Sequence, residues 1–264
     1  MRLAIPALAA ALLPTVASGA AASPLYLKVY DRTIVGRNAF IEGRDTVALP
    51  ATYQDHQLTL YAAYDLYPRL RVTVDAVPIG VAAYDGKTRA YFGGGAFGVE
   101  AELWRGPVIL GAAIRVGGRP EAPELGRPTV DGTELVVTPV VGTFLGGAAG
   151  TLLWPLEWGW VAARVGAEAY GALELSPAVF GNAQLGWRTR SPLELALQVQ
   201  LWHATEVDPP VNVLGSGNTR YLGFDLDATW WFSEGFGLFA GVGGVVYATH
   251  NAATPSLRLG VQLR

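Results

Sequence analysis

Histidine is the residue type most often used for proton transfer and zinc binding, and this chain has three, His56, His203 and His250. They lie far apart, and none has the short spacing to a second ligand that a zinc site on one element needs. Ser216, in a Gly-Ser-Gly-Asn run, would come near His203 if both lie at the same strand end, as in a lipid hydrolase. No Gly-x-Ser-x-Gly motif and no third, orienting residue accompany this pair. We therefore expect no catalytic residue, no metal site and no cofactor, and the hydrolase is an alternative only.

Glycine runs are the second candidate for chemistry. Residues 93–95 are all glycine, but no Gly-Lys-Ser or Gly-Lys-Thr sequence follows, so they do not form a phosphate-binding loop. Glycine within a strand is typical of curvature or of a close approach between backbones. We interpret residues 93–95 and the glycines of residues 241–244 in that way.

Charged residues recur on alternate positions of segments whose other positions are aliphatic. Residues 193–201, Leu-Glu-Leu-Ala-Leu-Gln-Val-Gln-Leu, show this pattern, which gives a β-strand one apolar and one polar face. A barrel that turns its apolar faces to lipid encloses the polar faces in a lumen. The pore-lining set that we predict is Asp65, Arg71, Asp75, Glu100, Glu102, Arg115, Arg164, Glu168, Arg188, Glu194, Asp225, Asp227 and Arg258. Its eight acids and five arginines predict a weak preference for cations.

Two other interpretations of the polar face stay open. The charges can pair with one another and plug the lumen, since a twelve-stranded barrel lies between filled eight-stranded barrels and open sixteen-stranded ones. Alternatively, the polar face meets water on the outside of a secreted soluble β-protein. Tyr61, Phe180 and Phe239, which we also expect in the lumen, would allow a hydrophobic solute without predicting one.

The alternation predicts an all-β fold, a transmembrane antiparallel up-and-down barrel of about twelve strands. Its strands of roughly 10–14 residues suit a tilted membrane crossing, which needs about 9–11 residues. We predict strands over residues 28–43, 56–66, 70–83, 91–104, 108–117, 134–150, 157–170, 177–188, 193–203, 220–232, 236–249 and 255–264.

Two kinds of connection alternate along these segments. Short turns flanked by aromatic residues, such as residues 67–69 and 104–107, alternate with more polar and generally longer connections, such as residues 44–56 and 117–133. Short turns at one end and longer loops at the other are typical of outer-membrane barrels. Seven tryptophans lie at or near the short-turn end and predict an interfacial girdle: Trp104, Trp154, Trp158, Trp160, Trp187, Trp230 and Trp231. The alternative is a tryptophan-rich core in a soluble sandwich.

Composition and the N-terminus indicate export to a membrane. The chain of 264 residues is 51% hydrophobic and only 16% charged, with no cysteine and a formal net charge of −3. Residues 1–23 have a positive start, an apolar stretch and small residues for cleavage, which predicts a signal peptide followed by one barrel domain, residues 24–264. Beyond that segment no run of 18 apolar residues occurs, which leaves a barrel as the main membrane option. Without a basic cluster, nucleic acid is not an expected partner.

One segment resembles a known family. Residues 53–66, Tyr-Gln-Asp-His-Gln-Leu-Thr-Leu-Tyr-Ala-Ala-Tyr-Asp-Leu, followed by Val-Pro-Ile-Gly at residues 77–80, are similar to the early hairpin of the transporter-type barrels of the meta-pathway phenol-degradation family. The resemblance covers about a quarter of the chain, which as a whole is similar to Gram-negative outer-membrane barrels. It implies a transporter or porin-like role and supplies no catalytic residues. The chain ends in Leu263-Arg264, where such barrels present an aromatic residue to the assembly machinery. We therefore expect a different insertion signal or an incomplete C-terminus.

These observations favour an outer-membrane channel or transporter for small solutes that has no enzymatic activity. Its expected partners are outer-membrane lipid, an unidentified small-molecule solute and the barrel-assembly machinery. A barrel that only displays its loops, without transport, is the main alternative.

Overall fold

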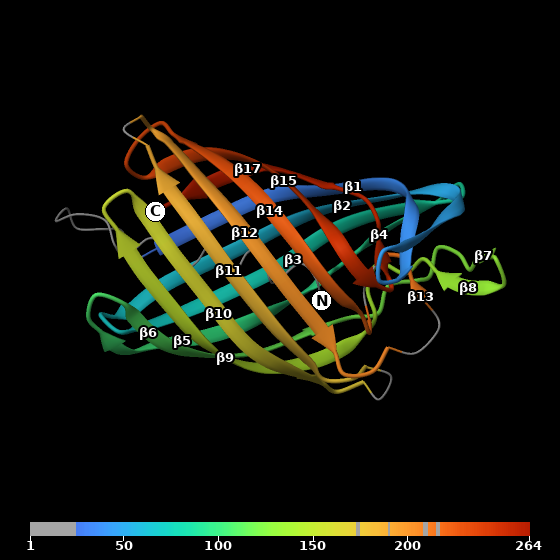
Figure 1. The fold of residues 1–264 in the computed structure, drawn as a ribbon, viewed down its shortest axis with the longest axis horizontal. Coiled ribbons are helices and arrows are strands. Elements are labelled where there is room, and N and C mark those ends of the chain that lie inside the picture. Colours follow the sequence, from blue (N-terminus) through green and yellow to red (C-terminus); the bar gives the residue numbers. More distant parts are fainter. Residues whose placement is uncertain (1–24, 173–174, 190, 208–210, 215–216) are drawn as a thin grey trace.

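A computed structural model describes residues 25–172, 175–189, 191–207, 211–214 and 217–264 of the protein. Twelve antiparallel strands form a closed barrel, as predicted (Figure 1). The barrel closes because β1 (Leu25–Glu42) pairs with β2 (Asp45–Tyr67) on one side and with β17 (Ser256–Leu263) on the other. Within the described residues, no helix is long and apolar enough to cross a membrane. The predicted signal peptide, residues 1–23, lies outside this part of the chain.

The other wall strands follow one another in chain order, which is the up-and-down topology. They are β3 (Leu70–Tyr84), β5 (Gly94–Arg105), β6 (Ile109–Arg119), β9 (Thr143–Leu156), β10 (Gly159–Tyr170), β11 (Ala178–Arg188), β12 (Leu193–Ala204), β14 (Arg220–Trp231) and β15 (Phe236–Thr249). Each pairs with the wall strand before it and with the wall strand after it. Among the described wall strands, none therefore has an unpaired edge along the part that would face the membrane.

Five short strands lie at the loop end. β4 (Lys87–Tyr91) extends the wall beside β3, and β16 (Asn251–Ala252) pairs with β1. β7 (Thr129–Val130), β8 (Thr133–Val136) and β13 (Val211–Asn212) form a small separate sheet at the same end of the barrel (Figure 1). The β3–β4 hairpin turns at Asp85 and Gly86, whose φ angles of 48° and 73° are those of a type I′ turn.

Two of the predicted boundaries are wrong. The sixth predicted strand, residues 134–150, is in fact β9, Thr143–Leu156, because the apolar residues 135–140 belong to a separate buried cluster and not to the wall. The predicted loop over residues 44–56 is the first half of β2, which pairs with β1 and, from Tyr53 on, also with β3. Alternation continues there, with Leu49 and Tyr53 both fully buried.

Candidate functional site

The barrel has an apolar outer face and a polar inner face. On β12, Leu197 and Leu201 are 45% and 50% exposed on the outside, while Gln198 and Gln200 between them are buried inside. All thirteen residues of the predicted pore-lining set lie on inward positions of this alternation, and most of them form ion pairs. That they line a conducting pore stays a prediction.

One group of ion pairs joins strands that are not neighbours in the wall. Arg164 on β10 donates a hydrogen bond of 2.8 Å to Glu100 on β5. Arg115 on β6 forms ion pairs with Glu168 on β10 and, at 4.0 Å, with Asp75 on β3. Because these partners come from strands separated by one or two others, their side chains meet inside the lumen rather than along the wall.

A second group lies against the seam where the barrel closes. Arg258 on β17 is 2.9 Å from both Asp225 and Asp227 on β14. Lys28 on β1 is 3.5 Å from Asp227, and its ammonium group lies 3.9 Å from the ring centroid of Phe239. The charge of this buried lysine is therefore matched by a carboxylate and by the face of an aromatic ring.

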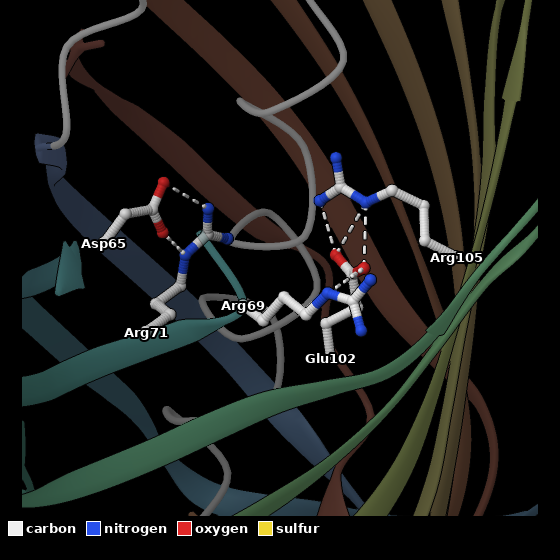
Figure 2. A network of polar contacts seen from close by, with 5 residues as sticks. All are labelled: Asp65, Arg69, Arg71, Glu102 and Arg105. Atoms are coloured by element: carbon white, nitrogen blue, oxygen red, sulfur yellow. Dashed lines mark hydrogen bonds and ion pairs between the residues drawn. The ribbon is translucent and has the colours of Figure 1, made fainter. Parts of the chain in front are cut away.

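The short-turn end of the lumen holds a cavity of about 300 Å³. Figure 2 shows its polar contacts: Arg71 holds Asp65 through bonds of 2.6 and 3.2 Å, and Arg105 and Arg69 both face Glu102. The lining also includes apolar side chains such as Ile109 and Leu153. Arg188 and Glu194, 3.6 Å apart, belong to a separate pair on β11 and β12.

At the loop end the lumen is covered by a segment that we call the cap, residues 120–142 and 211–214. The two pieces join where the amide of Val213 donates to the carbonyl of Val136. Leu125, Leu135 and Val137 of the cap are fully buried. They belong to one apolar cluster with inward side chains of β1, β2, β3 and β4, including Ile34, Leu49, Tyr53, Tyr84 and Tyr91.

Aromatic side chains lie inside the barrel, as predicted. Tyr61, Phe180 and Phe239 are 0%, 3% and 3% exposed. Phe180 stacks on Trp202 with ring centroids 5.8 Å apart. The inner face of the barrel therefore carries aromatic rings as well as amides and charges.

The tryptophan girdle is corrected at two positions. Trp104, Trp154, Trp158, Trp187 and Trp230 are each about half exposed on the outside of the short-turn end. Trp160 is 1% exposed with its ring 5.2 Å from the Arg188 guanidinium, and Trp231 lies 3.8 Å from that of Arg264. Both therefore face inward. Side chains alternate along a strand, and each of these tryptophans is an odd number of positions from the outward-facing residues of its own strand.

Several inward polar residues were missing from the predicted set. Lys28 and Arg32 lie on β1, whose alternation is hard to recognise, and their direction follows only from the pairing of β1 with β17. Asp55 accepts a hydrogen bond of 2.6 Å from Tyr91, in a stretch expected to be a loop. Arg119 ends β6 and is 9% exposed. It lies on the same face of β6 as Arg115, and this alternation was the sequence signal that could have identified it.

The histidines form no joint site. His56 shares a hydrogen bond of 2.9 Å with Thr33 on the outer face, while His203 and His250 lie on other strand ends. In the ranges that the structure covers, no group of three His, Cys, Asp or Glu side chains is placed to hold a metal ion. Ser216, the partner considered for a hydrolase, lies outside the described residues.

The barrel is similar to solved outer-membrane proteins, although their sequences differ widely from this one. The COG4313 outer membrane channel from Pseudomonas putida F1 has a TM-score of 0.67 and 13% identity, covering 95% of this chain and 98% of that one. The translocator domain of the autotransporter NalP from Neisseria meningitidis has a TM-score of 0.54 and 11% identity, covering 100% and 93%. No protein-family model and no curated protein matches the sequence. The chain therefore has the fold of an outer-membrane β-barrel.

Proposed function

We propose that this protein is an outer-membrane channel for small solutes, with its path through the barrel lumen. The observation that supports this proposal is the polar inner face: charged and amide side chains are buried inside the barrel, and a cavity of about 300 Å³ lies at the short-turn end. Outer-membrane lipid would contact the apolar outer face, and the assembly machinery would insert the chain. The fold shared with a protein named as an outer membrane channel supports this proposal.

Selectivity for cations should be weak at most. The predicted surplus of acids disappears once the other inward charges are counted. Asp55, Lys28, Arg32 and Arg119 bring the inner face to nine acids and eight bases, and Arg69, Arg105 and Arg264 also pair with its carboxylates. Most of these charges are already paired, so a passing ion meets little net field. We expect a channel that is nearly non-selective.

The passage is narrow. Two further cavities, one beside Thr59 and one beside Gln200, have volumes of about 40 and 50 Å³. The cap covers the lumen above them. Small solutes would therefore cross by displacing side chains and cap residues, and single-channel conductance should be low.

Reconstitution of the purified chain tests the proposal. Planar bilayers under a KCl gradient give conductance and reversal potential, and liposome swelling with sugars gives solute entry. The double variant E100Q/R164Q, which removes the lumen-crossing ion pair without leaving a lone charge, should conduct more than wild type, whereas the outer-face variant L201A should not. Absence of both conductance and swelling in all three proteins would overturn the channel, and clear anion selectivity would overturn the charge argument.

The alternative is a structural barrel without transport. The buried cap residues and the ion pairs that cross the lumen favour this alternative, since both place side chains inside the barrel. This alternative predicts that E100Q/R164Q stays as impermeable as wild type.

A further inference from the structure

Arg119 differs from the other buried cations of the barrel. Lys28, Arg115, Arg164 and Arg258 are buried, and each has a carboxylate oxygen within 4.0 Å. Arg119 is 9% exposed, and among the described residues it forms no ion pair, while its Nε and Nη1 atoms have no hydrogen-bond partner. An unpaired buried ion costs several kcal/mol, so a group from outside the chain is the natural partner.

A cavity lies next to this side chain. It has a volume of about 40 Å³, and Arg119, Thr59, Asp75 and Arg115 line it. A cavity needs a volume of about 10–15 Å³ to hold one water, so this one has room for two or three atoms of the size of a water oxygen. The Asp75 carboxylate is itself paired with Arg115, at 4.0 Å, and does not neutralise Arg119.

Two further features shape the cavity. Thr59 is 1% exposed, and its hydroxyl oxygen has no hydrogen-bond partner, so it is free to donate. The glycine run at residues 93–95 forms another side of the cavity, and a Cβ atom on Gly94 would lie 2.5 Å from Cγ of Arg119. The close backbone approach expected of these glycines thus leaves room for the arginine.

We propose that Arg119, with the Thr59 hydroxyl, binds a small monovalent anion inside the barrel, either chloride or the carboxylate group of a small organic acid. The guanidinium supplies two free N–H donors, and the cavity excludes groups much larger than a carboxylate. If the protein is a channel, this site lies along the solute path. Binding itself does not require transport, so the two proposals fail separately.

Unfolding in detergent measures the binding directly. The full chain is unfolded with urea at constant ionic strength, while sodium isethionate, which has a bulkier sulfonate in place of a carboxylate, is replaced stepwise by sodium formate or by sodium chloride. A ligand that binds only the folded state raises the unfolding midpoint in a saturable way. We expect such a rise for wild type, none for R119M, and about threefold or more weaker apparent affinity for T59V.

The matched control is R188M, which removes an inward arginine that has a carboxylate partner, Glu194. It should keep the full response to the anion. R119M should also be more stable than wild type in isethionate, because it removes an uncompensated charge. A response to formate alone assigns the site to organic carboxylates, and a response to both anions assigns it to small anions in general. Equal responses of wild type and R119M, or no response to either anion, would show that Arg119 binds neither anion and would overturn the proposal.

Discussion

Arg164 on β10 and Glu100 on β5 are joined by a hydrogen bond of 2.8 Å across the lumen, although β6 and β9 separate their strands in the wall. Both side chains are at least nine-tenths buried. The bond therefore ties together parts of the wall that the sheet ladder connects only indirectly. In the proposed channel, the pair would also lie across the path of a solute.

Breaking this pair from one side should destabilise the barrel strongly. R164Q leaves Glu100 as a buried, unpaired carboxylate, and such losses cost about 3–5 kcal/mol. E100Q/R164Q should recover much of the loss, since neither charge is then left alone. Urea unfolding in lipid vesicles measures both variants, and a double variant no more stable than R164Q would show that the pair acts through packing.

An added charge should destabilise the barrel far more on its outer face than on its inner face. L197R places a guanidinium against lipid, at a cost of about 2–4 kcal/mol near the bilayer midplane. Q198R, one residue further, points inward to a position directly opposite Asp225 and should cost far less. Refolding into vesicles compares the two, and equal costs would contradict the assignment of faces on β12.

Tryptophan fluorescence should separate the outward girdle from the inward rings. The chain has 8 tryptophans, so single-tryptophan variants are practical. Brominated lipids should quench a protein that retains only Trp187, which is 55% exposed, and leave one that retains only Trp160, which is 1% exposed, nearly unquenched. Strong quenching of Trp160 would place it back in the girdle.

Cap removal should increase permeability. Replacing residues 120–142 with a short Gly-Ser linker removes Leu125, Leu135 and Val137 from the apolar cluster at the loop end. Conductance and sugar entry should rise, and the barrel should stay folded because the wall ladder does not use these residues. Heat-modifiable gel migration checks folding, and unchanged permeability of a folded variant would mean that the constriction lies deeper.

The contact between Gly186 and Trp160 should not tolerate a methyl group. A Cβ atom on Gly186 would overlap the indole ring, whereas one on Gly181 of the same strand would lie 3.9 Å from Leu201. Overpacking of this kind costs about 1–3 kcal/mol. G186A should therefore unfold at lower urea than G181A, and a similar midpoint for both would show that the ring can move away.

Strand faces follow from sequence because side-chain direction has a period of two, so Glu194 and Leu197 could be assigned without a structure. The cap could not be assigned, since the apolar residues 135–140 have the composition of a wall strand and differ only in what they pack against. Partners across the lumen, such as Arg164 and Glu100, depend on closure of the whole sheet. The unpaired state of Arg119 was equally inaccessible, because it depends on where every acid in the barrel ends up.

The seam between β1 and β17 has a consequence for how the wall holds together. β17 is 8 residues long and pairs with β1 only from Leu27 to Ile34, while the ladder of β1 with β2 continues to Glu42. Fewer residue pairs therefore join β1 to β17 than join the two strands of most hairpins. The ladder of β17 with β15 is equally short, from Phe236 to Gly243, so β17 is held by short ladders on both sides. We therefore expect β17 to separate from the wall before the strands of the longer hairpins.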